Sequence, residues 1–207
     1  VCGQEYDHAN VYSADADNHK IIAKCYYDES ENRGSLTIST PTVSGGLTEI
    51  FYDGSPKEAV VTNDFSEVKP EIEVTYTYQA ADSNETKTLT KDEKPTAAGN
   101  YTASVSLIGA DKKTATVSVS YEIKKASNDF TTALSCSDHT YAKDETPKPN
   151  ATAKFGTVTY KYAKADSDGN APAADSAYTD AIPVNAGNYA VKAYVAETDN
   201  YAGLASD

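Results

Sequence analysis

The chain has 207 residues, and its 31 acidic and 18 basic side chains give a formal net charge of −13. This acidity disfavours nucleic acid and anionic membrane surfaces as partners, because both would be repelled. The mean hydropathy is negative, and no stretch approaches the roughly 18 apolar residues of a spanning helix, so we expect no membrane insertion in this segment. The complete absence of methionine indicates a processed or excised piece of a longer protein.

Residues 1–47 differ from the rest of the chain and predict a small β-hairpin or meander module. A module of about 45 residues rarely has a sufficient core of its own, so we expect a staple or a neighbouring domain to support it. Apolar and polar residues alternate in two places, which predicts two strands. The inward positions are Ile21, Ala23, Cys25 and Tyr27 in the first strand, and Leu36 and Ile38 in the second.

Two cysteines and two histidines form a symmetric pattern inside this module: Cys2, His8, His19 and Cys25. Two thiolates and two imidazoles suit tetrahedral zinc, and a closed site with four ligands would be structural. The spacing matches no standard zinc motif. A Cys2–Cys25 disulfide is the alternative for an exported protein, and free thiols with surface histidines are the third possibility. We expect no other cofactor.

An internal repeat organises the remaining residues. EVTYTY around Tyr76 returns as TVTYKY around Tyr160, and TAAGNYTASV around Gly99 returns as VNAGNYAVKA around Gly187. Two anchors in the same order at nearly constant offset predict two copies of one unit, which we place at residues 48–126 and 127–207. In both copies, apolar residues alternate with Thr and Ser along each run, and turn residues separate the runs. This pattern predicts small, all-β sandwiches with one wet face.

The turn before the repeated AGNY sequence predicts a specific structural role for two tyrosines. Immunoglobulin-type sandwiches place a tyrosine at the turn that enters a late strand, where its hydroxyl bonds back to the preceding backbone. Gly99 with Tyr101, and Gly187 with Tyr189, have the required spacing. We therefore expect both tyrosines to fix corners of the fold.

These sequences are similar to MBG-type bacterial immunoglobulin-like repeats. YDGSPKEA, VTYTY, KPTAAGNYTASVSL and VSVSYEIKKA resemble one repeat, and VTYKY with YTDAIPVNAGNYAVKAYVAETDNYAG resembles a second. Such repeats occur in large secreted or wall-attached proteins, chiefly of Gram-positive bacteria, so the resemblance implies two tandem immunoglobulin-like sandwiches at the cell surface. The second copy lacks a counterpart of VSYEI. We therefore expect its last strand to be cut short, leaving an edge for a following module.

Other groups of residues give little indication of catalysis or metal binding. Cys136 lies near His139, but LSCS predicts a small apolar residue packed in the first strand of the second repeat. Asp166, Asp168 and Asn170 lack the glycine position and the distal Glu of a calcium loop, which favours a polar hairpin loop. Known nucleophile, zinc-protease and phosphate-loop motifs are absent from the sequence. We expect no catalytic activity.

The sequence favours a non-catalytic spacer of a bacterial surface or secreted protein, which presents other domains of the same protein away from the cell. The alternative is an adhesin that binds a glycan or a host glycoprotein through exposed aromatic rings. Its best candidates are Tyr26, Tyr178 and Tyr201, because most other tyrosines fall on inward strand positions.

Overall fold

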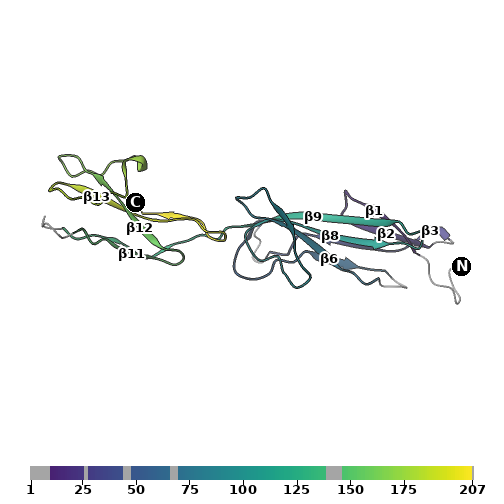
Figure 1. Cartoon of the computed structure of the whole chain (residues 1–207). Coiled ribbons are helices and arrows are strands. Elements are labelled where there is room, and N and C mark those ends of the chain that lie inside the picture. The colour runs from purple at the N-terminus through teal and green to yellow at the C-terminus, as the bar shows by residue number, and fades with distance from the viewer. Residues whose placement is uncertain (1–9, 26–27, 44–47, 66–69, 139–145, 207) are drawn as a thin grey trace. The chain divides into compact units, whose positions relative to one another are not determined.

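The computed structural model describes residues 10–25, 28–43, 48–65, 70–138 and 146–206. The chain is all-β, as predicted, and built from antiparallel sheets consistent with a β-sandwich. Its contacts divide it into two compact units, Val1–Lys124 (unit 1) and Lys125–Asp207 (unit 2). Figure 1 labels many of the strands named below.

Unit 1 contains two sheets that pack face to face. One has the antiparallel order β1-β2-β3-β5, and the other has the order β4-β9-β8-β6-β7, in which only the short β4 runs parallel to its neighbour, β9. The strands are β1 (Asn10–Asp15), β2 (Lys20–Cys25), β3 (Asp28–Ser39), β4 (Ile50–Phe51), β5 (Val60–Asn63), β6 (Val74–Gln79), β7 (Thr86–Thr88), β8 (Gly99–Ile108) and β9 (Thr114–Lys124).

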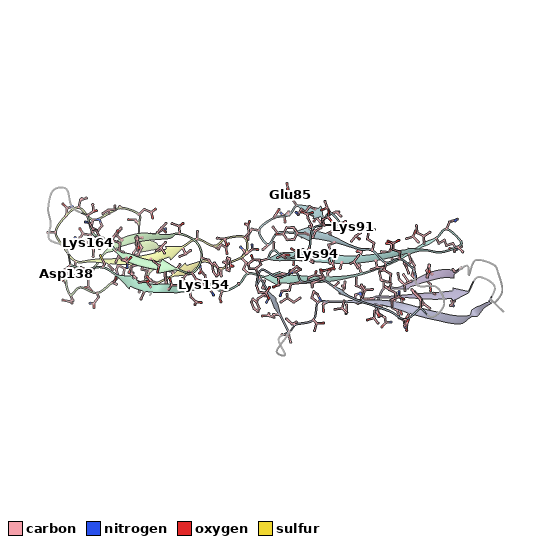
Figure 2. All side chains as sticks on the ribbon, turned by 90° about the horizontal axis from the view of Figure 1, so that it is seen from below. Glu85, Lys91, Lys94, Asp138, Lys154 and Lys164 are labelled. Carbon is pink, nitrogen blue, oxygen red and sulfur yellow. The ribbon has the colours of Figure 1, made fainter. Side chains whose placement is uncertain are left out.

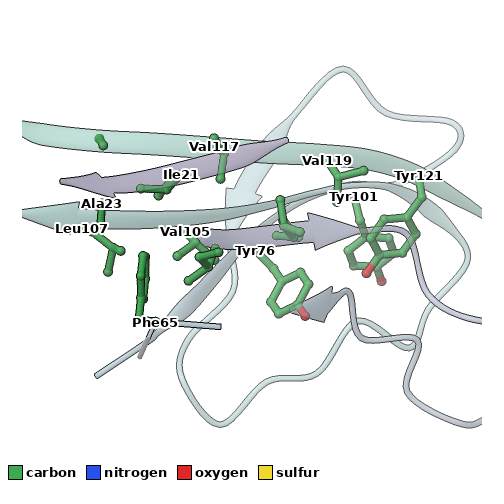
Figure 3. Close-up of a cluster of buried hydrophobic side chains, with 14 of the residues drawn as sticks. Ile21, Ala23, Phe65, Tyr76, Tyr101, Val105, Leu107, Val117, Val119 and Tyr121 are labelled. Atoms are coloured by element: carbon green, nitrogen blue, oxygen red, sulfur yellow. The ribbon is translucent and has the colours of Figure 1, made fainter. Parts of the chain in front are cut away.

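The core of unit 1 lies between these two sheets (Figure 3). Burial alternates strictly along β8 and β9, which confirms the period-two pattern predicted for them. Their outer faces carry hydroxyl pairs, such as Thr102 with Ser120 at 2.9 Å. The inward side chains of these two strands are Tyr101, Ala103, Val105, Leu107, Ala115, Val117, Val119, Tyr121 and Ile123.

The N-terminal strands share this core. β3 pairs with β5 across the boundary expected near residue 47, and Ile21, Leu36 and Ile38 are at most 2 % exposed in the same cluster as Val105. The structure therefore divides the chain near residue 124. The sequence predicted a further boundary near residue 47, but the strands on either side of it pair with each other. A segment this small buries its apolar face against a neighbour because it cannot enclose a core alone.

Unit 2 has a smaller core and shorter strands. β10 (Phe130–Ser135) pairs with β11 (Asn150–Ala153), and a second sheet has the order β12 (Val158–Lys164), β13 (Tyr189–Val195), β14 (Leu204–Ala205). Its buried apolar residues are mostly alanines, with two larger tyrosines: Ala151, Tyr162, Ala163, Ala165, Tyr178, Ala193 and Val195.

Strand pairings in the two units correspond. β10 pairs with β11 as β3 pairs with β5, and β12 pairs with β13 as β6 pairs with β8. β13 pairs with β14 as β8 pairs with β9, but over only two residue pairs in place of ten. The internal repeat of the sequence is therefore also a repeat of strand pairing, and its clearest departure is at β14.

The surfaces of both units carry exposed charged side chains (Figure 2). Examples labelled there are Glu85, Lys91 and Lys94 in unit 1, and Asp138 and Lys154 in unit 2. Several form ion pairs, including Lys94 with Glu58 at 2.9 Å. Exposed pairs of this kind contribute little stability, so these charges mainly keep the surfaces hydrated.

Candidate functional site

The most organised side-chain arrangement in unit 1 is a group of four tyrosines, Tyr76, Tyr78, Tyr101 and Tyr121, here called the tyrosine cluster. They project from β6, β8 and β9. The rings of Tyr78 and Tyr101 are 4.9 Å apart between centroids, and those of Tyr101 and Tyr121 are 5.6 Å apart and nearly parallel. These are favourable spacings for aromatic pairs.

Each hydroxyl of the cluster bonds to the backbone of a loop. The hydroxyls of Tyr78, Tyr101 and Tyr121 donate to carbonyls, and that of Tyr76 accepts from an N–H. The partners are Ala98 O (3.1 Å from Tyr78), Ala97 O (2.9 Å from Tyr101), Lys57 O (2.6 Å from Tyr121) and Ala59 N (3.0 Å from Tyr76). The cluster thus fixes two loop segments, 57–59 and 97–98, which a further backbone bond from Lys57 N to Pro95 O joins at 2.7 Å.

Burial changes the acidity of these phenols. It raises the pKa of Tyr76, Tyr101 and Tyr121 above the ordinary 10.0, because the charged phenolate would lose its hydration. The neighbouring tyrosines add to the shift for Tyr101 and Tyr121. Phenols with raised pKa values remain neutral at physiological pH, which suits a structural role and not an acid–base one.

A shallow, open hollow of about 250 Å³ lies beside the cluster. Its wall includes Tyr78, Tyr101, Leu89, Lys87 and Glu93. Three charged side chains lie on this wall. Lys87 and Glu93 pair with each other at 3.2 Å, Lys94 pairs with Glu58 at 2.9 Å, and Glu93 also accepts the Thr90 N–H at 2.8 Å. Hydrogen bonds to N–H groups lower the pKa of Glu93 and keep it ionised. The polar groups therefore satisfy one another and do not converge on a ligand position.

The four residues of the predicted zinc site are not brought together where the structure describes them. Cys2 and His8 lie outside the described residues, as does the side chain of Cys25. His19 precedes β2 in the turn after β1, whereas Cys25 is the last residue of β2, opposite Asn10. At about 3.3 Å per residue, that strand separates the two by roughly 20 Å. His19 and Cys25 therefore cannot share one metal ion, since each zinc–ligand bond is only about 2.0–2.3 Å. The Cys2–Cys25 disulfide stays a prediction.

His19 has a structural contact instead. Its Nδ1 lies 2.6 Å from the carbonyl oxygen of Ser118 on β9, so the ring donates a hydrogen bond from one sheet to the other. In the described part of the chain, no group of three or more His, Cys, Asp or Glu side chains could hold a metal ion.

Two other sequence-based candidates also serve local structure. Cys136 is exposed just after β10 and not packed inward as expected, because the strand ends at Ser135; His139 lies outside the described residues. Asp166 accepts N–H groups from Asp168 (3.0 Å) and Asn170 (2.7 Å) of its own turn. Its oxygens are therefore used within the hairpin loop predicted there.

The two predicted corners differ in the structure. Tyr101 is 3 % exposed and bonds to the carbonyl four residues earlier, as described above. Gly99 has φ 147°, and a Cβ there would lie 2.5 Å from the Gln79 carbonyl, so only glycine fits. Gly187 has a similar φ of 157°, but Tyr189 is 37 % exposed, and no hydrogen bond of its hydroxyl is found within the described ranges.

The two described residues proposed for glycan binding, Tyr178 and Tyr201, do not form an open platform. Tyr178 is 6 % exposed and donates to Pro172 O at 3.3 Å. Tyr201 stacks on Phe155 with centroids 3.6 Å apart. Tyr26 lies outside the described residues.

One repeated contact was not predicted. The Tyr160 hydroxyl accepts the Ala151 N–H at 2.9 Å, just as the Tyr76 hydroxyl accepts the Ala59 N–H. The repeated TYTY and TYKY sequences were the signal for this contact, because they place a tyrosine at the same inward position of both copies.

Comparisons with protein families, with curated proteins and with solved structures find no match for this chain. No helix among the described residues is long and apolar enough to cross a membrane.

Proposed function

We propose that this chain is a non-catalytic spacer segment of a secreted or cell-surface bacterial protein, whose units hold other domains of that protein at a distance. Such a segment must stay folded when its two ends are pulled apart. The observation that carries the proposal is a parallel backbone pairing found in each unit near its C-terminal strand.

In unit 2 this pairing joins the beginning of the unit to a residue near its end. Ala126 and Tyr201 form a parallel bridge. Ala126 N donates to Asn200 O, and Ala202 N donates to Ala126 O, both at 2.9 Å. In unit 1, Ile50 and Phe51 of β4 pair in parallel with Ile123 and Lys124 of β9.

The parallel direction matters under tension. When one strand is pulled from its beginning and a parallel partner from its end, the force runs along the strands, so the hydrogen bonds between them must break together. An antiparallel hairpin pulled apart at its open end loses its bonds one after another. The bridge at Ala126 is thus loaded in the more resistant direction when unit 2 is stretched.

Pulling single molecules through their two ends tests this proposal. We expect two separate unfolding events, with length gains of at most about 42 nm for unit 1 and about 28 nm for unit 2, at about 3.4 Å per residue. A chain that extends smoothly without discrete unfolding events would contradict the proposed spacer function.

An adhesin function remains the alternative, and the hollow beside the tyrosine cluster is the feature that favours it. The partners of such an adhesin would be glycans or host glycoproteins. Binding to a glycan array that is lost in Tyr78→Ala, with the fold intact by circular dichroism, would favour the adhesin over the spacer.

A further inference from the structure

The outer face of the β12–β13 sheet in unit 2 carries two lysines directly opposite each other. Lys161 of β12 is the cross-strand partner of Lys192 of β13, and directly opposite residues project from the same face of a sheet. Ala193, the next residue of β13, is 0 % exposed, so both lysines lie on the face turned away from the core. Like charges in this arrangement repel each other and destabilise the pair.

The corresponding strands of unit 1 have no such charges on this face. β6 and β8 place Thr75 opposite Ser104 and Thr77 opposite Thr102, and their small hydroxyl side chains carry no charge. The lysine pair is therefore a property of unit 2 and not a requirement of the repeated strand pairing.

Only one of the two lysines has an anionic partner. The Asp175 carboxylate, at the start of the short 3-10 helix η2 (Asp175–Ala177), lies 2.8 Å from the Lys192 ammonium. Among the described residues, no carboxylate forms an ion pair with Lys161. Its ammonium lies 5.4 Å from the centroid of the Tyr194 ring, and a neutral ring does not cancel its charge.

Tyr194 adds a hydrogen-bond donor without an acceptor. It lies two residues after Lys192, on the same face of β13. Its hydroxyl oxygen is buried and finds no hydrogen-bond partner in the part of the chain that the structure describes, which is a costly state for a polar group. Burial raises the pKa of this phenol, Asp175 raises it further, and Lys192 lowers it, so both charges lie close to the hydroxyl.

Residues 172–179, here called the strap, supply the carboxylate. The strap is attached to β12 by two backbone hydrogen bonds between Thr179 and Tyr162, at 2.7 and 2.9 Å. The Lys192 ammonium lies 5.2 Å from the centroid of the Tyr178 ring. The Asp175 side chain is 67 % exposed, and an ion pair with so exposed a partner is weak. A carboxylate from solution can therefore compete with Asp175 for Lys192.

Donors exceed acceptors on this face. Two ammonium groups and one phenol face a single carboxylate, and a second carboxylate would accept hydrogen bonds from the groups that remain. An acidic protein segment with many charges would be repelled by a chain of net charge −13. A sugar acid carries one negative charge among neutral hydroxyl groups, so it supplies the missing acceptor with little of that repulsion.

We propose that the outer face of β12 and β13 binds the carboxylate of a sugar acid through the ammonium groups of Lys161 and Lys192 and the hydroxyl of Tyr194. Asp175 occupies part of this site in the structure and competes for Lys192. The strap moves away to open the Tyr194 hydroxyl to the ligand, and its attachment at Thr179 is the hinge. The site is separate from the tyrosine cluster of unit 1 and does not depend on the spacer function.

Titration of the whole chain with glucuronate tests this site, with backbone amide chemical shifts of β12 and β13 as the readout. Glucose is the matched probe without a carboxylate, and acetate is the matched probe without a sugar. We expect saturable shifts at Lys161, Lys192 and Tyr194 with glucuronate, and binding weaker by about tenfold or more with either control probe.

Three variants separate the roles of the residues. Lys161→Gln should weaken glucuronate binding by about tenfold or more, whereas Lys154→Gln, which removes an exposed lysine above the Phe155 ring of the same unit, should leave it unchanged. Asp175→Asn should strengthen binding, because a competing carboxylate is removed. Tyr194→Phe should weaken binding without lowering the urea midpoint of unit 2, since the hydroxyl has no bond to lose.

The proposal is overturned if glucuronate causes no saturable shifts, or if acetate or glucose binds as tightly. It is also overturned if Lys161→Gln and Lys154→Gln bind glucuronate equally well. Weaker binding by Asp175→Asn would contradict the assigned competition, because it would make Asp175 a part of the ligand-binding arrangement.

Discussion

At the scale of single residues, tyrosine hydroxyls join loops to sheets by hydrogen bonds to the loop backbone. The cluster in unit 1 combines ring contacts with four bonds to loop backbone, so each phenol contributes both apolar burial and a satisfied polar group. Tyr189 of unit 2 occupies the repeated sequence position but remains 37 % exposed. The two units therefore contain a matched pair of residues for measuring what burial and bonding contribute.

Replacing Tyr101 with Phe should lower the free energy of unfolding of unit 1 by about 1 kcal/mol, because the Ala97 carbonyl loses its donor at a buried position. Urea unfolding followed by amide signals from each unit measures the effect. The control is Tyr189→Phe, which should change the stability of unit 2 by less than about 0.5 kcal/mol. Equal losses in both variants would contradict the distinct roles assigned to the two tyrosines.

Alkaline pH should destabilise unit 1 through the same cluster. Burial raises the pKa of Tyr101 and Tyr121 in the folded unit, whereas in the unfolded chain both ionise near 10.0. The stabilising contribution is thus complete below pH 10 and falls as the pH rises above it, since only the unfolded state readily releases these protons.

This loss is checked by urea unfolding at a series of alkaline pH values, with tyrosinate absorbance followed in parallel. Tyr121→Phe should reduce the dependence of stability on pH above 10. Ionisation of these phenols with no change in the urea midpoint would be incompatible with their buried, bonded state.

At the scale of strands, the N-terminal segment is part of the unit 1 sandwich. Its strands complete the sheet opposite β8 and β9 by pairing β3 with β5, and Ile21 is fully buried in the common core. A side chain of β2 should therefore matter for the whole unit and not for a separate small module.

Ile21→Ala should cost unit 1 about 2–5 kcal/mol, the usual range for such a truncation in a close-packed core. The matched control is Ile108→Ala on β8, where the side chain is 69 % exposed and the cost should stay within about 0.5 kcal/mol. The readout is the urea midpoint reported by amides of β9. If those amides are unaffected by Ile21→Ala, β1–β3 do not belong to the cooperative unit.

Local patterns predicted part of this fold. Alternating residues in β8 and β9 predicted which side chains are buried, because a strand has a period of two wherever it lies. The pairing of β3 with β5 joins residues far apart in sequence, and no local pattern specifies such a partner. The proposed metal site failed for a reason already present in the sequence. The alternation of Ile21, Ala23 and Cys25 predicts an extended strand, which carries Cys25 away from His19.

At the scale of the whole molecule, two units of related strand pairing differ in the side chains that fill their cores. Unit 1 has a full-length β9 and the sheet of β1–β3, whereas unit 2 has a two-residue β14 and an alanine-rich core. The buried side chains of unit 2 are mostly alanines, and each of these contributes less burial free energy than a larger apolar side chain. On the proposed spacer function, the parallel bridge at Ala126 is one feature by which unit 2 would resist tension.

The most direct test of the spacer account is the unfolding force of unit 2 in Ala126→Pro, measured by pulling the chain through its ends. Proline removes the N–H that bonds to Asn200 O. Ala126→Ser keeps this donor and serves as the control, and unit 1 in the same molecule serves as the internal reference. The account predicts a lower unfolding force for unit 2, because Ala126 loses its bond to Asn200 O, while unit 1 is unchanged. An unfolding force for unit 2 that is the same in Ala126→Pro and Ala126→Ser would contradict it.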